Sequence, residues 1–449
     1  MKKILYLLLL QLSYPSTYSQ SIITPDVTIS TMVTQVNKDS LQATVRTLVA
    51  FGTRNTLSTQ TSSSRGIGAA RKWVLQKFNT ISAANNYRLT AYIDTVTLQP
   101  NGKRIDTTLL LGNVVALLRG TDTADKRLFV ITAHLDNMRT NVMDRVNDAP
   151  GANDDASGCA AVLECARILS AYKFAPSILL ITFSGEEQGL LGAYYQAAKA
   201  KKENWDIQAI LNNDIMGSNN SSQTGIIDNT KLRVFSEGLP AYETEKNAKQ
   251  IRSLGQENDG KARQLARYIK EVGERYVPNL EVKLVYRNDR FLRGGDHTAF
   301  AEQGYTAVRL TEMNENYTRQ HQDVRMEAGV QYGDLEQYID YEYLRKNTAI
   351  NLSVIANLAL APAAPQQVTI DTKKLSNYTT LSWKPPVGKP THGYYILIRE
   401  TTSAFWERKI FTPNTTIELP YSKDNYYFAL QAVNQAGNES LMVLPQVVR

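Results

Sequence analysis

The stretch "SILLITFSGEEQG", residues 177–189, joins an apolar run to two adjacent glutamates. A continuous apolar run of this length is typical of a strand buried on both faces of a parallel sheet. Two adjacent carboxylates, Glu186 and Glu187, repel each other, and neither belongs in an apolar core. Adjacent side chains of a regular strand point to opposite faces of the sheet. The flanking glycines, Gly185 and Gly189, therefore predict a turn that lets both carboxylates serve one site.

Further apolar runs alternate with helical patterns on both sides of this stretch. Strands are expected at residues 127–134, 176–184, 207–217 and 306–312, and helices at 158–172, 190–203 and 261–276. Such an alternation predicts an α/β domain whose sheet is mixed but mostly parallel and is covered by helices on both faces. Ligands of such sheets bind at the carboxyl ends of the strands.

The composition changes at "LALAPAAPQQVTI", residues 358–370, where alanine and proline concentrate as in a linker. The sequence after it has short alternating strands and no helical pattern, which predicts a small all-β sandwich of antiparallel strands. Together with the N-terminus, this divides the chain into four parts. They are a signal peptide (1–19), an α/β domain (20–360), a linker (361–365) and a β-sandwich (366–449).

The N-terminus, "MKKILYLLLLQLSYPSTYSQ", has a basic pair and then an apolar run, residues 4–12, that is too short to span a bilayer. Small residues, Thr17 and Ser19, stand before Gln20 in the pattern of a cleavage site. This pattern predicts a cleavable signal peptide and export to the periplasm, the cell surface or the medium.

The formal net charge of +7 is spread over 449 residues without a dense basic run. This distribution argues against a nucleic acid as the partner, and no other apolar run has the length of a transmembrane segment. Cys159 and Cys165 are six positions apart on an expected helix and point to different faces. We therefore expect two unpaired cysteines in the core.

Histidines and carboxylates gather at the ends of the expected strands. Three of the four histidines in the chain belong to the α/β domain, namely His134, His297 and His321. The carboxylates at strand ends and in nearby loops are Asp136, Asp154, Asp155, Glu186, Glu187, Asp214 and Asp323. Histidine and carboxylate ligands without thiolates suit zinc or a similar divalent ion. Five candidate ligands exceed what one tetrahedral ion needs, whereas two ions that share a carboxylate would use all five.

The order H-x-D, N-D-D-A-S-G, S-G-E-E and N-D-x-x-G, with a late histidine, resembles the co-catalytic zinc aminopeptidases of the bacterial leucyl aminopeptidase and aminopeptidase Y type. This resemblance covers roughly residues 41–358. It implies a zinc-exopeptidase fold, two divalent ions, most simply Zn²⁺, and peptide or protein substrates. The stretches "LSWKPP" and "YYFALQAVNQAGNES" resemble a fibronectin type III domain.

The resemblance also implies a role for each residue of the motifs. The implied metal ligands are His134, Asp154, Glu187, Asp214 and His321. Asp154 would bridge the two ions, His134 and Asp214 would bind one of them, and Glu187 and His321 would bind the other. Glu186 would act as the general base. Asp136 would accept a hydrogen bond from the ring N–H of His134, and Asp323 would do the same for His321.

Two features depart from the family pattern or lie beyond it. The late histidine stands in "YTRQHQDVR", in a looser register than usual, so His297 in "GGDHTAF" is the other candidate ligand. We expect His321 to be the ligand, and we expect the substrate or the groups behind the metals to be contacted by Asp155, Asp296 and His297. Arg290 and Arg293 either face the substrate and favour acidic or polar groups, or are ordinary loop charges.

The function expected from these residues is a secreted aminopeptidase that hydrolyses the N-terminal peptide bond through a water activated by two metal ions. A glutaminyl cyclase or a carboxypeptidase of the same fold is an alternative. A further alternative is a non-catalytic binding protein that acts through its sandwich. The sandwich itself could contact carbohydrate or a cell surface, pack on the α/β domain, or serve as a spacer, because a fold of this kind does not specify a function.

Overall fold

The computed structural model describes residues 20–240, 244–373, 375–388 and 391–448. The predicted signal peptide, residues 1–19, lies outside these described residues. Within them, no helix combines the length and the hydropathy needed to cross a membrane. Both cysteines are buried and unpaired, as expected.

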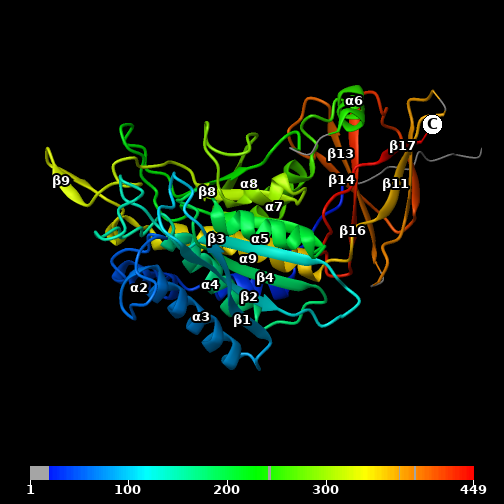
Figure 1. Ribbon diagram of the computed structural model, residues 1–449. Helices are drawn as coiled ribbons and strands as arrows, with labels where there is room; N and C mark the ends of the chain where they lie inside the picture. The colour runs from blue at the N-terminus through cyan, green and yellow to red at the C-terminus, as the bar shows by residue number, and fades with distance from the viewer. Residues whose placement is uncertain (1–19, 241–243, 374, 389–390, 449) are drawn as a thin grey trace, which may run out of the picture.

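The α/β domain is built on a mixed sheet of eight strands in the order β1-β2-β4-β3-β5-β8-β6-β7 (Figure 1). Four neighbouring strands at its centre, β4, β3, β5 and β8, are parallel, whereas β1, β2 and β6 introduce antiparallel pairs. This arrangement confirms the predicted mixed, mostly parallel sheet. The strands are β1 (Leu89–Leu98), β2 (Leu109–Leu118), β3 (Leu128–His134), β4 (Ser177–Phe183), β5 (Ile207–Asn213), β6 (Lys231–Phe235), β7 (Glu281–Val285) and β8 (Ala307–Glu312).

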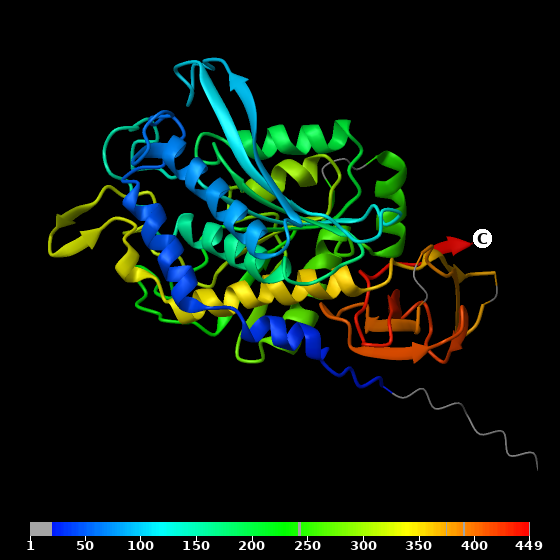
Figure 2. The same cartoon turned by 90° about the horizontal axis from the view of Figure 1, so that it is seen from below.

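Helices cover both faces of this sheet (Figure 2). The larger apolar core unites one face with α1 (Val27–Thr34), α2 (Lys38–Ala50), α3 (Gly66–Ala84), α4 (Ala156–Leu169), α7 (Lys261–Tyr276) and α9 (Tyr341–Leu360). A smaller core on the other face involves α5 (Leu191–Lys202) and α8 (Asp296–Glu302). The strands between them are therefore shielded from water on both sides, which explains their continuous apolar runs.

Several elements were not named from the sequence. The region of residues 218–260, which looks polar throughout, contains β6 and the exposed helix α6 (Glu245–Leu254). Helix α9 is buried along nearly its whole length, and three asparagines lie among its buried residues, Asn347, Asn351 and Asn357. Because a helix of this kind has no polar face, the amphipathic period that reveals a surface helix is missing.

The C-terminal domain is a sandwich of two sheets, with strand orders β15-β12-β11-β17 and β14-β13-β16. Its core contains Trp383, Phe428, Leu430 and Ala432, which supports the alternation seen in the sequence. One expectation was wrong, because β17 pairs with β11 in the parallel direction in an otherwise antiparallel sandwich. The strands are β11 (Gln366–Asp371), β12 (Thr379–Lys384), β13 (Gly393–Glu400), β14 (Arg408–Thr412), β15 (Thr416–Leu419), β16 (Tyr426–Val433) and β17 (Gln446–Val448). A short hairpin of β9 (Arg325–Glu327) and β10 (Val330–Tyr332) extends from the α/β domain, and a 3₁₀ turn, η1 (Glu336–Tyr338), precedes α9.

The sandwich packs directly on the α/β domain. Leu397 of β13 and Ala429 of β16 belong to the same apolar core as the helices of the α/β domain. Glu439, a fully buried sandwich residue, accepts a hydrogen bond of 3.0 Å from Arg275 of α7 and lies 3.3 Å from the ammonium of Lys409. The pair of Glu439 with Arg275 and the pair of Lys409 with Glu271 of α7 tie the two domains together, which does not suit a freely moving spacer.

The interface predicts a large effect of removing the charge of Glu439. We expect Glu439→Gln to lower the free energy of unfolding by about 3 kcal/mol, because Arg275 and Lys409 lose a buried partner. Urea unfolding followed by circular dichroism measures this change. The matched control is Asp148→Asn, whose ion pair with Arg65 is exposed and is worth at most about 1 kcal/mol. An effect of Glu439→Gln as small as that of the control would contradict a structural role for this interface.

The same pair predicts how stability depends on pH. Burial acts to raise the pKa of Glu439, but the charges of Lys409 and Arg275 outweigh it and lower this pKa to about 2. A carboxyl group whose pKa is depressed in the folded state stabilises that state above its unfolded pKa of about 4.3, and the stabilisation is lost below it. The difference in unfolding free energy between the natural chain and Glu439→Gln should therefore be constant near neutral pH. It should shrink as the pH falls from about 4.3 to about 2.

Candidate metal centre

The centre lies at the carboxyl ends of three neighbouring parallel strands. Strand β3 runs between β4 and β5, and its register places His134 beside Phe183, the last residue of β4. The two glutamates follow β4, Asp214 follows β5, and Asp154 lies in the loop before α4. Strand order alone thus brings to one edge of the sheet residues that are far apart in the chain.

The turn after β4 is the one that the glycines predict. Gly185 has a φ of +81°, in the region that favours glycine, and a Cβ at this position would lie 3.0 Å from Cβ of Leu191. Beyond the turn, Glu186 and Glu187 both line the same cleft. Leaving the extended conformation at Gly185 is what allows two adjacent carboxylates to face one site.

Asp154 is the centre of the cluster, because each of its carboxylate oxygens faces a different histidine. Its Oδ1 lies 3.1 Å from Nε2 of His134, and its Oδ2 lies 2.9 Å from Nε2 of His321. Each of these two histidines also lies near a second carboxylate. Nε2 of His134 lies 3.7 Å from Oδ1 of Asp214, and Nε2 of His321 lies 3.4 Å from Oε1 of Glu187.

These side chains fit divalent cations in spacing and in chemistry. Tetrahedral zinc with bonds of about 2.0–2.1 Å holds its ligand atoms roughly 3.3 Å apart, close to the separations found here. Two groups of side chains have ligand atoms close enough to hold one ion, His134–Asp154–Glu187 and His134–Glu186–Asp214. Within the described chain, Oε1 of Glu187 is buried and has no hydrogen-bond partner. A cation would supply the partner that this atom lacks.

The electrostatics of the cluster show the same demand for positive charge. Burial acts to raise the pKa of Asp154, yet hydrogen bonds from His134 and His321 hold it well below its usual range. Burial raises the pKa of Glu186 well above its usual range, and the nearby charges of Glu187 and Asp214 add to this effect. Divalent cations favour the ionised forms of such carboxylates.

Asp136 does not hold the ring of His134 in the way the sequence predicts. Nδ1 of His134 lies 3.8 Å from the carboxylate of Asp136 but only 3.0 Å from the backbone oxygen of the same residue. The carboxylate instead accepts from the backbone N–H groups of Glu186 and Glu187, at 3.2 and 3.1 Å, and from the hydroxyl of Thr56 at 3.0 Å. It therefore fixes the glutamate turn, while the ring of His134 is oriented by a carbonyl.

Two further aspartates hold backbone near the cluster. Asp155 accepts from the backbone N–H groups of His134, at 3.1 Å, and of Gly158 and Ile215, which joins β3, α4 and the segment after β5. Asp334 accepts from the backbone N–H of Asp154 at 2.7 Å. These carboxylates position the chain segments that carry the candidate ligands, and Asp155 is not among the residues that line the cleft described below.

The loop that carries His321 is held by Asp323, but not through the histidine ring as expected. Asp323 accepts from Nε of Arg139 at 2.9 Å and from the backbone N–H of Thr140 at 3.2 Å. The hydroxyl of Thr140 donates to the backbone oxygen of His321 at 3.3 Å. Arg139 and Thr140 lie on the loop after β3, so Asp323 ties the late histidine to the strand-end loops.

His297, the alternative ligand, belongs to neither of the described groups of side chains that are close enough to hold one ion. Its Nε2 lies 2.8 Å from the backbone oxygen of Asn288, and burial lowers its pKa. The other candidate beside it, Asp296, is buried, and neither carboxylate oxygen has a hydrogen-bond partner among the described residues. Burial raises the pKa of Asp296 to about 8.

One charged residue of this site was missed in the sequence. Arg309 of β8 is fully buried, and its guanidinium lies 2.9 Å from Oδ1 of Asp214 and 3.2 Å from Oδ2 of Asp289. The signal was present, because an arginine inside the apolar run "TAVRLTE" needs a buried partner. Asp334 and Thr56 gave no comparable signal, since they stand in polar loops.

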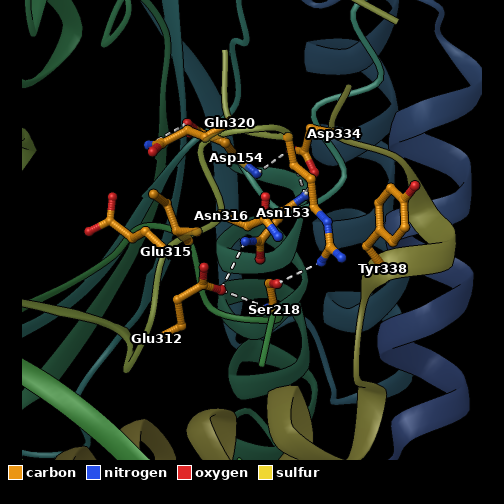
Figure 3. Close-up of a pocket in the computed structure, with 11 residues that line it drawn as sticks. Asn153, Asp154, Ser218, Glu312, Glu315, Asn316, Gln320, Asp334 and Tyr338 are labelled. Atoms are coloured by element: carbon orange, nitrogen blue, oxygen red, sulfur yellow. Dashed lines mark hydrogen bonds between the residues drawn. The ribbon is translucent and has the colours of Figure 1, made fainter. Parts of the chain in front are cut away.

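A cleft with a volume of about 350 Å³ opens over the cluster. Its lining includes Asp154, Glu186, Glu187, Asp214 and His321, so it brings together five of the residues singled out from the sequence. Behind Asp154 lies a smaller pocket, shown in Figure 3. There the carboxylate of Glu312 accepts from the side chain of Asn153 at 2.9 Å and from the backbone N–H of Ser218 at 2.7 Å. This network supports the loop of Asp154 from the side opposite the cleft.

Comparison with known proteins agrees with this geometry. Residues 113–341 match the model of peptidase family M28, and residues 363–443 match the fibronectin type III domain. A protein from Leptosphaeria maculans named "Probable zinc metalloprotease" is 40% identical over 422 residues, which cover 94% of this chain and 97% of the relative. A protein of the same description from Pyricularia oryzae is 40% identical over 428 residues, covering 94% of this chain and 85% of the relative.

The fold is also that of a solved aminopeptidase, LapA of Legionella pneumophila, with a TM-score of 0.54 at 17% identity and coverage of 78% of both chains. The chain therefore belongs to peptidase family M28 and carries a C-terminal fibronectin type III domain. It is a zinc metallopeptidase, and its substrates are peptides or proteins.

The contacts of Asp136 lead to a prediction about zinc affinity. Asp136→Asn keeps the size of the side chain but offers one acceptor oxygen in place of two, so the backbone N–H of either Glu186 or Glu187 loses its partner. We expect zinc affinity, measured by competition with a chromogenic chelator, to fall about 10- to 100-fold. The control is Asp106→Asn, whose carboxylate is exposed and pairs only with Arg145 among the described residues. Unchanged affinity in Asp136→Asn would show that the glutamate turn does not depend on this carboxylate.

Proposed function

We propose that this metallopeptidase is an aminopeptidase that removes N-terminal residues with the help of two zinc ions. The observation that carries the proposal is the position of Asp154, whose two oxygens face two histidines, each accompanied by a further carboxylate. In this proposal His134 and Asp214 would hold one ion, Glu187 and His321 would hold the other, and Asp154 would be shared by both.

Zinc held by these residues would supply a water of lowered pKa and would polarise the carbonyl of the scissile peptide bond. Glu186 lines the cleft and lies close enough to His134 and Asp214 to share an ion with them, but the proposal leaves it out of both half-sites. Its carboxylate is then available to take a proton from the attacking water and to deliver it to the leaving amine. Asp136 holds the backbone of Glu186 and so keeps this base in place.

Two observations favour cleavage at the N-terminus of a chain. The cleft has a volume near the lower end of the range of about 300–1,000 Å³ for small-molecule sites, which suits a chain end better than the middle of a long peptide. A free α-amine could bind beside Asp214, at the ion that this residue would help to hold. The structurally similar protein LapA is described as an aminopeptidase.

We also propose that the protein is exported and that residues 1–19 are removed. The support is the sequence itself, in which a basic pair, a short apolar run and small residues before Gln20 form a signal pattern. N-terminal sequencing of the protein recovered from the periplasm or the medium should begin at Gln20.

Substitution of each of the two adjacent glutamates should have a different effect on zinc content and on rate. We expect Glu187→Gln to lose about one zinc ion per chain, because an amide is a poor ligand for zinc, and to lose activity with it. We expect Glu186→Gln to retain both ions and to lower kcat by about 10²- to 10⁴-fold, because only proton transfer is removed. Zinc content by inductively coupled plasma mass spectrometry and kcat on aminoacyl 4-nitroanilides measure these effects.

The matched control is Glu203→Gln, an exposed carboxylate at the end of α5 that lies outside the cleft. It should match the natural chain in zinc content and rate. An unchanged rate in Glu186→Gln would remove this residue from the mechanism, and a single zinc per natural chain would contradict the two-ion site. Cleavage of N-acetylated peptides as fast as free peptides would contradict the aminopeptidase.

A further inference from the structure

The cleft carries a second cluster of charge beside the proposed metal ligands. Its remaining charged lining residues are three arginines, Arg104, Arg290 and Arg293. Arg290 and Arg293 come from the loop between β7 and α8, and Arg104 comes from the loop between β1 and β2. Three guanidinium groups from two separate loops therefore face a cleft of about 350 Å³.

Arg290 is fixed in place and gives this cluster a rigid side. Its Nε lies 3.1 Å from Asp289, and its Nη1 lies 3.3 Å from Glu315. Its side chain is only 9% exposed. An arginine held by two carboxylates has lost its freedom before any ligand arrives, so the part of Arg290 that lines the cleft is already fixed in position.

Arg293 and Arg104 keep donors that the protein does not use. The guanidinium of Arg293 makes no hydrogen bond to the described residues, and its nearest acid, Glu315, is 3.8 Å away. Arg104 donates through Nη1 to the backbone oxygen of Glu187, at 2.6 Å, which leaves its other N–H groups open. This contact also places Arg104 directly against the glutamate turn.

The balance of charge in the cleft favours an anion. Two divalent ions would match the four carboxylates that line it, Asp154, Glu186, Glu187 and Asp214. The three guanidinium groups would then remain as positive charge. Asp289 and Glu315 offset this charge only in part, because Asp289 also pairs with Arg309 and Glu315 also pairs with Arg233. Apolar side chains contribute little to the lining, with Met138 and Leu190 as the main examples.

We propose that the arginine cluster is a subsite for a substrate carboxylate next to the scissile bond. A carboxylate accepts two parallel hydrogen bonds from a guanidinium, and these are among the strongest that a protein makes to a ligand. The carboxylate can be the side chain of an N-terminal glutamate or aspartate, or the C-terminal carboxylate of a dipeptide. This inference rests on the proposed aminopeptidase function and adds the class of substrate.

Four substrates distinguish the two sources of the carboxylate. The first pair is the 4-nitroanilide of glutamate and the 4-nitroanilide of leucine. The second pair is the dipeptide Leu-Ala with a free C-terminal carboxylate and the same dipeptide with a C-terminal amide. We expect the natural chain to prefer either the glutamyl anilide over the leucyl anilide or Leu-Ala over its amide. For the preferred compound, Arg293→Gln should lower kcat/KM about 10- to 100-fold, mainly by raising KM. Loss on the glutamyl anilide assigns the subsite to the side chain, and loss on Leu-Ala assigns it to the C-terminus.

Arg293→Lys should restore part of the loss, because it returns the charge without the planar pair of donors. The matched control is Arg287→Gln, an exposed arginine on the same loop that contacts Phe291 and does not line the cleft. It should behave as the natural chain does. The inference is overturned if Arg293→Gln lowers kcat/KM equally for all four substrates. It is also overturned if Arg293→Gln changes neither the ratio of kcat/KM for the glutamyl and leucyl anilides nor the ratio for Leu-Ala and its amide.

A binding measurement separates this inference from the proposed function. Isothermal titration of the zinc-loaded protein with the α-hydroxamates of glutamate and leucine needs no turnover. Tighter binding of the glutamate compound that is lost in Arg293→Gln supports the side-chain subsite, even if no aminopeptidase activity is found. Equal affinity for both compounds, together with equal rates on Leu-Ala and its amide, overturns it even if the enzyme is an active aminopeptidase.

Discussion

Mutual repulsion among buried carboxylates is the constraint on which the rest of this structure depends. Asp154, Glu187 and Asp214 are all at most 5% exposed, and Glu186 lines the same cleft. Groups of like charge in a buried site are stable only when positive charge and hydrogen-bond donors compensate them. Two histidines and Arg309 supply part of this compensation, and in the proposed function zinc would supply the rest. The fold delivers all of these groups to one place because three parallel strands end side by side.

A second set of acids keeps the first set in position, and it does so through the backbone. Asp136 holds the glutamate turn, Asp155 holds the end of β3 and the start of α4, and Asp334 holds the loop of Asp154. Each carboxylate accepts backbone N–H groups that would otherwise be unpaired at a strand end or a helix start. Because the loops are already fixed, the side chains of the proposed ligands lie at the spacing of a coordination shell. Little further conformational entropy would then be lost when a metal binds.

The same logic extends outward from the metal centre. Arg309 pairs with Asp214 and Asp289, and Asp289 in turn holds Arg290, which lines the cleft. The chain of ion pairs thus runs from the proposed ligands to the proposed substrate contacts. The fibronectin type III domain contributes side chains to the larger apolar core of the α/β domain. It also pairs with that domain through the buried carboxylate of Glu439. It is therefore a structural part of the enzyme as well as a separate fold.

The sequence by itself determined the alternation of strands and helices at the centre of the sheet, the turn at Gly185 and the candidate ligands at the strand ends. These follow from local periodicity and from the rule that ligands collect at the carboxyl ends of parallel strands. Helix α9 was not predicted from the sequence, because it is buried on all sides and has no polar face. Only the tertiary structure decided what Asp136 and Asp323 contact, because their partners lie in loops at least fifty positions away. It alone brought Arg104 to the side of Arg290 and Arg293, since the sequence carries no local signal for contacts between distant loops.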